Sequence, residues 1–571
     1  MFPIIGERMA HLTYKKKNGI KYYYAQERER KNSKSVRKWQ KYLGPLHKII
    51  AAVEATPEQP KFAEIFQLGA PAAYWSMAKQ IDAISIIDSV AGKRDQGLSI
   101  GFYLTLAAIN RGIEPTSKSS MWNWFKDTIL LRVLPEVNKT NISSQRFWDN
   151  MSELEKDDIE KIWLRLIDSV LKKHDIDLSS VSFDGTNFYT FISSFNVRCS
   201  LAKRGKNKQG RRDLRQVSFA LFCTKKDHIP LYFDVYEGNK PDSKEFEFVI
   251  EKFFKAFADK MPSKQGMTIV FDKGNNSKDN FKKFVEGSNY HFVGSVKPSD
   301  HKELSTISNN DKCFRPCSDT KLEGVKAFRI KKHIYNKDLT VVVTFNNTLY
   351  STQLMSINNV MNNCMDKLSS LSNKLEARRV GKVKKGKKPT VESITKQVKT
   401  ICSPQHIKNL IQTTITQENE HPILTYTANE KAYSELSDTY LGKNIIITDN
   451  HHWTTDEIIL AYRSQYVIED AFKHIKDRKT GSWWPMHHWT DNMIRVHGLY
   501  CCMTLLINAL LIKEINKIGI TISMNNLYKK LTGIREVINV FSKTRQSVVS
   551  KLDPIQKKLF NLFGMHDYVS K

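Results

Sequence analysis

The chain has 571 residues, of which 40% are hydrophobic and 11% are aromatic. This length and composition predict a globular protein of roughly two to four domains and exclude a disordered chain. Lys and Arg total 89 against 59 Asp and Glu, a formal net charge of +30. An excess of this size predicts a polyanionic partner, and it favours nucleic acid over a membrane surface.

The cysteines and the apolar runs indicate the cellular compartment of the protein. The eight cysteines form no Cys-x2-Cys pair, which favours free thiols in a reducing cytosol over a zinc site. The start, MFPIIGERMAHL, has too short an apolar run for a signal peptide. The apolar run Leu499–Ile512 is interrupted by Asn508 and is too short to span a bilayer. The sequence therefore predicts a soluble, cytoplasmic, nucleoid-associated protein without a membrane partner.

Residues 11–46 alternate basic and aromatic side chains, and Asn18-Gly19 between two alternating runs predicts a β-hairpin. Such a ribbon could stack on bases and bind phosphates, or it could be a small sheet with a solvated basic face. From 57 to 175 apolar residues recur at three and four, including Phe62–Phe66, which predicts an all-helical region. Its Arg111, Lys118 and Arg146 could bind DNA, although most nearby tryptophans are expected in the core.

The period changes from helix to strand at residue 178. The run LSSVSFDGTNFYTF predicts a strand with Ser182, Asp184 and Thr186 on one face. A basic loop at 203–215, two more strands, a helix after Pro241 and a strand ending at Asp272 follow, then a short helix and a strand at 290–298. This order is that of an RNase H-like mixed sheet, in which the first and fourth strands are parallel neighbours. Asp184 and Asp272 would then lie close together.

A third carboxylate is expected on the last helix of such a core. Residues 300–445 are instead interpreted as a β-rich inserted domain, in which the tract RRVGKVKKGKKP at 378–389 is either a mobile solvated loop or a DNA contact. Thr454 then caps a helix that is predicted to continue through Tyr462–Lys476. Ile468, Phe472 and Ile475 form its apolar side.

The polar side of this predicted helix carries Tyr462, Glu469 and Lys476 at intervals of seven residues, with Lys473 beside them. The stripe could be a solvated face with ion pairs such as Glu469–Lys473, or it could bind metal and phosphate. Three converging carboxylates, Asp184, Asp272 and Glu469, would repel each other, and two Mg²⁺ ions would remove that conflict and catalyse phosphoryl transfer.

The chain resembles the DDE transposases of the insertion-sequence-four superfamily. The resemblance rests on SFDGTNFYTF, GRRDLRQVSFAL, IPLYFDVYEGNKPDSK, IVFDKG and YRSQYVIEDAFKHIK. The last matches the Tyr-x2-Arg-x3-Glu-x6-Lys signature of that superfamily at Tyr462, Glu469 and Lys476, whereas Gln465 takes the Arg position and Arg463 lies two residues earlier.

The resemblance implies Mg²⁺-dependent cutting at terminal inverted repeats, with Mn²⁺ as a substitute metal, strand transfer by the freed 3′-OH, and a homodimer in the synaptic complex. It assigns Asp184, Asp272 and Glu469 as catalytic metal ligands. The expected DNA-binding residues are Tyr462, Arg463, Lys473, Lys476, Lys203, Arg204, Arg211 and Arg212. Two alternatives remain: a transposase-derived DNA-binding protein that no longer cuts, and a non-transposing RNase H-like nuclease.

The predicted fold class is α/β, with an RNase H-like mixed-sheet core, an inserted β-rich domain, a mainly helical N-terminal region and a helical C-terminal tail. The predicted divisions are a basic aromatic β-ribbon at 1–56, a helical DNA-binding region at 57–175, the first part of the core at 176–299, the inserted domain at 300–445, the last core helices at 446–516 and a helical C-terminal region at 517–571.

Overall fold

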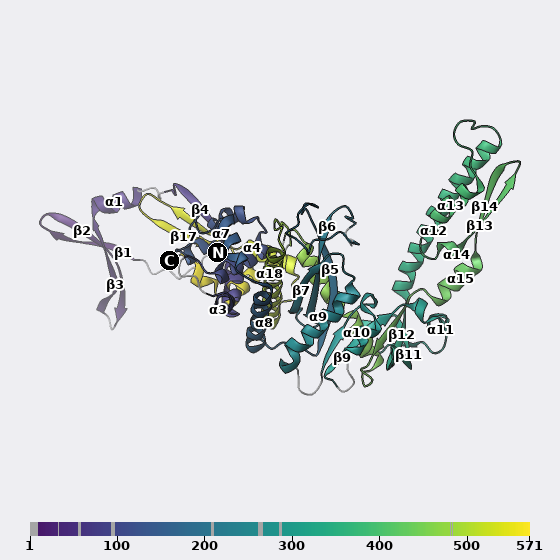
Figure 1. The fold of residues 1–571 in the computed structure, drawn as a ribbon. Coiled ribbons are helices and arrows are strands. Elements are labelled where there is room, and N and C mark those ends of the chain that lie inside the picture. The colour runs from purple at the N-terminus through teal and green to yellow at the C-terminus, as the bar shows by residue number, and fades with distance from the viewer. Residues whose placement is uncertain are drawn as a thin grey trace. The chain divides into compact units, whose positions relative to one another are not determined.

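The computed structural model describes residues 10–31, 34–54, 59–92, 97–206, 210–260, 266–284, 288–479, 481 and 483–570. Residues 1–9, and 207–209 of the basic loop, lie outside this range. The chain forms two compact units (Figure 1). The first contains the described residues up to Phe66 together with Glu536–Ser550 and Ser570, and the second contains Gln67–Arg535 and Lys551–Val569.

The first unit begins with an antiparallel three-stranded sheet of β1 (His11–Lys17), β2 (Ile20–Lys31) and β3 (Lys34–Pro45), followed by α1 (Leu46–Glu54). The predicted hairpin is confirmed, because Lys17 pairs with Ile20 and the two residues between them have positive φ values of 49° and 80°. Positive φ at both central positions is the type I′ turn that Asn-Gly favours.

A second sheet in this unit joins distant parts of the chain in the order β17-β16-β4. Its strands are β4 (Phe62–Gln67), β16 (Arg535–Val540) and β17 (Arg545–Val549). The helix predicted at Phe62–Phe66 is therefore wrong, and the C-terminal tail is not purely helical. Six residues of β4 are too few to distinguish a helical from an extended apolar pattern, and the partner strand lies near the other end of the chain.

The second unit starts with a helical layer, as the sequence predicts for most of 57–175. Its elements are α2 (Gly69–Gln80), α3 (Ala83–Ala91), α4 (Ile100–Ile113), η1 (Lys118–Ser120), α5 (Met121–Lys126), α6 (Leu130–Val133), α7 (Ser144–Ser152) and α8 (Lys156–Lys173). Every residue of α4 is buried, and α4 packs against the long α18 (Asp491–Lys517).

Helix α18 is the core helix of this layer. It also packs against α2 and α8, and Asn508, which interrupts its apolar run, accepts a hydrogen bond of 2.5 Å from the Tyr74 hydroxyl. Among the described residues it is the helix with the length and composition to cross a membrane, but 89% of that apolar window is buried inside the fold. Its burial accounts for its apolar character.

A nine-stranded mixed sheet forms the centre of the second unit, in the order β10-β11-β12-β15-β9-β8-β5-β6-β7. In chain order its strands are β5 (Ser180–Thr190), β6 (Arg215–Thr224), β7 (Pro230–Glu237), β8 (Met267–Val270), β9 (Tyr290–Val296), β10 (Arg315–Pro316), β11 (Val325–Ile334), β12 (Lys337–Asn346) and β15 (Lys443–Thr448). Its connections include α9 (Asp242–Phe257), η2 (Ala258–Lys260), η3 (Lys273–Asn275), α10 (Lys278–Lys282), η4 (Pro298–Asp300), α11 (Lys302–Ser305) and η5 (Thr320–Leu322).

The predicted adjacency of the first and fourth strands is confirmed. β5 pairs with β8 in parallel, and β8 pairs with β9 in parallel, whereas β5-β6 and β6-β7 are antiparallel. The sheet is therefore mixed, and β5 and β8 are neighbouring parallel strands within it.

The segment interpreted as an inserted domain at 300–445 divides into two parts, one within the central sheet and one outside it. Its strands β11, β12 and β15 extend the central sheet, because their backbone groups pair in register with each other and with β9. What leaves the sheet is largely helical: α12 (Asn347–Arg379), α13 (Val391–Ile401), α14 (Ile407–Leu410), the hairpin β13 (Ile411–Glu418) and β14 (His421–Ala428), and α15 (Glu430–Thr439).

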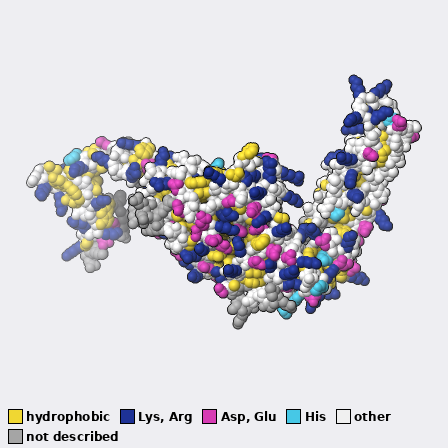
Figure 2. Space-filling model, viewed as in Figure 1, with side chains coloured by type: hydrophobic (Ala, Val, Ile, Leu, Met, Phe, Trp, Pro, Cys, Tyr) yellow, Lys and Arg dark blue, Asp and Glu magenta, His cyan; other side chains and the backbone are white. Residues whose placement is uncertain are grey.

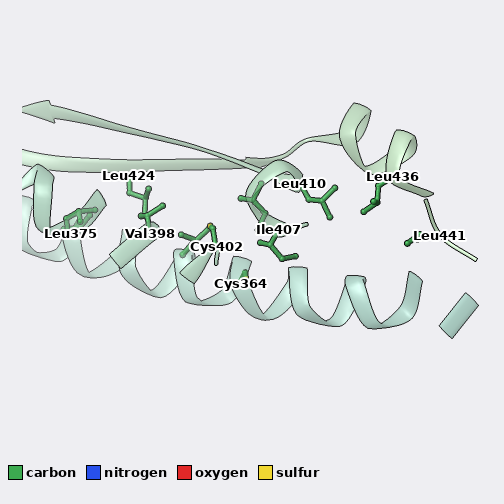
Figure 3. Close-up of a cluster of buried hydrophobic side chains, with 12 residues drawn as sticks. Cys364, Leu375, Val398, Cys402, Ile407, Leu410, Leu424, Leu436 and Leu441 are labelled. Atoms are coloured by element: carbon green, nitrogen blue, oxygen red, sulfur yellow. The ribbon is translucent and has the colours of Figure 1, made fainter. Parts of the chain in front are cut away.

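This excursion has its own core between α12 and the β13-β14 hairpin (Figure 3). Cys364 and Leu368 of α12 are buried with Val398 of α13, Leu410 and Leu424. The turn from α12 to α13 carries the tract predicted as a solvated loop or a DNA contact, and its residues 380–388 are exposed. Figure 2 shows Lys and Arg side chains gathered at this end of the excursion.

The chain returns to the central sheet through α16 (Thr455–Arg463), whose predicted Thr454 cap is confirmed by a reciprocal pair of bonds with Glu457. The remaining elements are α17 (Tyr466–Lys476), α18, α19 (Met524–Thr532), α20 (Pro554–Leu562) and η6 (Met565–Tyr568). Helix α17 packs against β5 and β6.

Candidate active site

Two of the predicted carboxylates lie on adjacent parallel strands. Ser182 of β5 pairs with Val270 of β8, so the same register continued by two residues places Asp184 level with Asp272, just beyond the end of β8. Both side chains are partly exposed. The Oδ1 atom of Asp184 accepts a hydrogen bond of 2.7 Å from the backbone N–H of Gly185.

The predicted continuous helix Tyr462–Lys476 is interrupted. α16 ends at Arg463 and α17 begins at Tyr466, because the residues between them make i→i−3 bonds, from Gln465 N–H to the Tyr462 carbonyl and from Ile468 N–H to the Gln465 carbonyl. A tighter turn of this kind changes the rotation between flanking residues. The seven-residue spacing therefore does not by itself align Tyr462 with Glu469.

The hydroxyl of Ser182 donates to the Ser464 carbonyl at 3.2 Å. This bond joins β5 to the short connection between the two helices. It fixes the start of α17 two residues from Asp184 along the strand, so the interruption in the helix is part of the site's architecture.

Tyr462 experiences the charges of two predicted carboxylates. Its hydroxyl donates to the Ser295 Oγ of β9 at 2.9 Å. Burial raises the pKa of Tyr462, the hydrogen bond with Ser295 opposes this shift, and the nearby charges of Asp272 and Glu469 raise the pKa further. The phenol of Tyr462 thus lies within electrostatic reach of carboxylates from both β8 and α17.

Lys476 is positioned at the same face of β5. Its Nζ donates to the Thr186 Oγ1 at 2.5 Å and lies 5.8 Å from the centroid of the Phe188 ring. Because residues of one strand alternate between faces, Ser182, Asp184 and Thr186 share the face that α17 covers. The predicted common face of these three residues agrees with both hydrogen bonds to the α16–α17 segment.

The remaining positions of α17 behave as a partly solvated face. Glu469 is exposed, and Lys473 pairs with Asp470 at 3.0 Å, which differs from the Glu469–Lys473 pair considered from the sequence. The expected apolar side is confirmed, because Ile468 and Ile475 are buried. Arg463 is exposed and donates to the Lys321 carbonyl at 3.2 Å.

The basic loop is attached to the far end of β5. Asn187 donates to the Lys206 carbonyl at 3.3 Å, and the buried Arg215 donates to the backbone carbonyls of Ala202 and Cys199. The predicted DNA-binding residues of this loop, all of them exposed, are Lys203, Arg204, Arg211 and Arg212. Of these, Arg211 pairs with Asp213 at 2.9 Å and Arg204 bonds with Ser194 at 3.1 Å.

The donor set fits a hard divalent cation, which prefers carboxylate oxygens. As the side chains stand, no group of three His, Cys, Asp or Glu residues in the described ranges is arranged to hold a metal ion. The structure thus brings Asp184 and Asp272 to one level of the sheet and Glu469 to the adjoining helix, without a preassembled three-carboxylate cluster.

Two partners in this site were not singled out as functional from the sequence. Thr186 receives the Lys476 bond, and its position two residues after Asp184 was the available signal. Ser295 receives the Tyr462 bond, and no local pattern in β9 distinguishes it from its neighbours.

Comparison with known proteins identifies the family of the chain. The family model described as a transposase DDE domain matches residues 175–506, more than half of the chain. The protein therefore belongs to the DDE transposase family, whose members are enzymes that cut and join DNA.

Among solved structures, the chain is similar to a piggyBac transposase in a cryo-EM synaptic complex with hairpin DNA. The sequence identity is 10% and the TM-score 0.37, over 84% of this chain and 83% of that one. None of the curated protein sequences matches the chain.

Proposed function

We propose that this DDE transposase is of the insertion-sequence-four type. In this proposal it cuts DNA at the terminal inverted repeats of its own element and joins the freed 3′-OH ends to target DNA. Its partners are these two kinds of double-stranded DNA and a second copy of the chain in the synaptic complex. Its place of action is the cytoplasm, at the nucleoid.

The observation that carries the proposal is the parallel register of β5 and β8, with Asp184 and Asp272 level at adjacent strands. The strand order β7-β6-β5-β8-β9 supports an RNase H-like core. Glu469 follows on the helix that packs against β5, and its charge acts on Tyr462 together with that of Asp272.

Asp184, Asp272 and Glu469 would hold the divalent cation, Mg²⁺ or Mn²⁺. The bound metal would activate the attacking oxygen and stabilise the leaving oxygen of the phosphodiester. Glu469 is exposed, so its side chain is free to adopt another rotamer towards the strand ends.

The cations of the chain would orient the DNA. Lys476 donates to the hydroxyl of Thr186, and a phosphate oxygen bound at the same place would give this ammonium group an anionic acceptor. Lys203, Arg204 and Arg212 would bind the backbone beyond the end of β5. Tyr462 would act through position, because its hydroxyl joins α16 to β9.

The alternative is a transposase-derived DNA-binding protein that no longer cuts. One observation favours it, namely that the three carboxylates are not assembled for metal binding among the described residues. A single measurement, Mg²⁺-dependent cleavage of DNA, distinguishes the two functions.

The test uses the full-length protein and a duplex carrying the inverted repeats that flank its coding sequence. Asp184→Asn, Asp272→Asn and Glu469→Gln are each expected to abolish nicking in Mg²⁺ while retaining gel-shift affinity in Ca²⁺. Asp470→Asn is the matched control, since it removes the adjacent carboxylate of α17, and it should cut at the wild-type rate. Nicking retained by any one of the three variants would remove that residue from the site, and an inactive wild type would favour the alternative.

A further inference from the structure

A polar cavity lies outside the proposed active site. It has a volume of about 400 Å³ and lies between η1, α7, the end of α4 and the segment at 485–489. Its described lining includes Arg111, Lys118, His488, Trp148 and Trp489, and it contains no Asp or Glu. We refer to it as the α4–α7 cavity.

Lys118 is the most informative side chain of this cavity. Its Nζ is buried and has no hydrogen-bond partner among the described residues. It lies 4.3 Å from the centroid of the Tyr500 ring and 5.0 Å from that of Phe147. Ring faces compensate a buried ammonium only in part, and a buried cation normally has an anionic or hydrogen-bonding partner.

A second cation lies beside it. Arg111 is 1% exposed, and its Nη2 donates to the Pro485 carbonyl at 2.8 Å. This carbonyl is a neutral partner. Burial, and then the charge of Arg111, hold the pKa of Lys118 well below its usual range.

Burial lowers the pKa of two neighbouring histidines, His497 and His488. His497 Nε2 donates to the Trp483 carbonyl at 2.8 Å, so its Nδ1 is the acceptor for the Tyr500 hydroxyl. Burial, followed by the charges of Lys118 and Arg111, lowers the pKa of His488 to about 3. The described lining of the cavity therefore offers two basic side chains, Lys118 and Arg111, and no carboxylate, which is the chemistry of an anion site.

Indole rings line the same cavity. Trp148 and Trp489 stack with their centroids 5.6 Å apart and an interplanar angle of 25°. Trp489 is 40% exposed, and the guanidinium of Arg198 lies 5.6 Å from its ring centroid. Aromatic faces next to cations can stack on a base while the cations bind its phosphate.

We propose that the α4–α7 cavity is a phosphate-binding site, in which Lys118 and Arg111 bind a phosphate group carried by a nucleotide or by a nucleic-acid strand. Trp489 provides the ring face for the attached base. The site uses none of the carboxylates proposed for cleavage, so this proposal can be tested independently of the proposed active site.

The test is binding to the full-length protein at constant ionic strength, measured by calorimetry and thermal shift. The probes are inorganic phosphate, thymidine monophosphate and a 5′-phosphorylated single-stranded tetranucleotide. At least one probe is expected to raise the melting temperature of the wild type. Lys118→Met should weaken that binding roughly tenfold to a hundredfold, because it removes a charge-assisted hydrogen bond.

Lys126→Met is the matched control, since Lys126 is an exposed lysine of the neighbouring α5, and it should bind like the wild type. Trp489→Ala provides a variant at a partly exposed position that should weaken thymidine monophosphate but not inorganic phosphate. Tighter binding of the tetranucleotide than of the mononucleotide would identify a strand as the source of the phosphate, and the reverse would identify a free nucleotide. A wild type that binds no probe, or a Lys118→Met variant that binds all of them equally well, would overturn the proposal.

Discussion

The Tyr462–Ser295 hydrogen bond distinguishes two roles for Tyr462. The bond is 2.9 Å long, and the Ser295 side chain is 3% exposed. A neutral hydrogen bond of this kind contributes about 1 kcal/mol, which corresponds to about fivefold in a rate if the bond is needed to position α16 in the transition state. We therefore expect Tyr462→Phe and Ser295→Ala each to slow single-turnover cleavage by up to about fivefold.

The double variant is the decisive one. If both residues act through their shared bond, Tyr462→Phe combined with Ser295→Ala should be no slower than either single variant. Single-turnover cleavage in Mg²⁺ measures this, with gel-shift affinity in Ca²⁺ as the control for binding. If Tyr462→Phe slows cleavage while Ser295→Ala cuts at the wild-type rate, the hydroxyl contacts DNA and the positioning role is wrong.

Three further predictions concern other parts of the protein. Lys476→Met should slow single-turnover cleavage about tenfold or more with little change in gel-shift affinity, because many other cations share the binding; an equal loss in both would make it an ordinary backbone contact. The hydrogen bond with Asp449 raises the pKa of His291, so its contribution to stability is complete below the unfolded pKa and is lost as pH rises through the folded one. The melting temperature of His291→Gln should therefore fall below that of the wild type more at about pH 6 than at about pH 9, and an equal difference would contradict this. Removing residues 1–58 should reduce the preference for the terminal repeat over random duplex in competition gel shifts at two salt concentrations, and an unchanged preference would place sequence recognition elsewhere.

The strands that carry or precede Asp184 and Asp272 were predictable because their signals are local. The alternation around Asp184 and the apolar run ending at Asp272 each lie within a single strand, and the element order then fixes which strands are neighbours. The hydrogen-bond partners of the side chains were harder to predict from the sequence. Lys476 meets Thr186, and Tyr462 meets Ser295, across contacts that depend on where α16 and α17 lie on the sheet.

The interruption between the two helices shows a limit of periodicity. Residues 462–476 have a good helical pattern, and the buried Ile468 and Ile475 agree with it. The pattern does not reveal the turn at Ser464 and Gln465, which a hydrogen bond from Ser182 of β5 accompanies. In the same way, strands β11, β12 and β15 have ordinary strand patterns, and these cannot say which sheet they join.

The fragment 1–175, an obvious choice for testing DNA recognition from the sequence, does not correspond to a structural unit. Its helices α2, α4 and α8 pack against α18, and its strand β4 pairs with β16. Such a fragment would expose a core surface, so an internal deletion or an N-terminal truncation of the full chain is the better experiment.

The pairing of β4 with β16 has a consequence for biosynthesis. A ribosome that has just completed β4 must add the residues up to Arg535–Val540 before the partner strand exists, which takes roughly 20 to 90 seconds at ordinary elongation rates. During that interval the edge of β4 that pairs with β16 remains unpaired. A nascent chain that has not reached β16 should therefore be a substrate for chaperones and proteases, and only a chain translated through Arg535–Val540 can close this sheet.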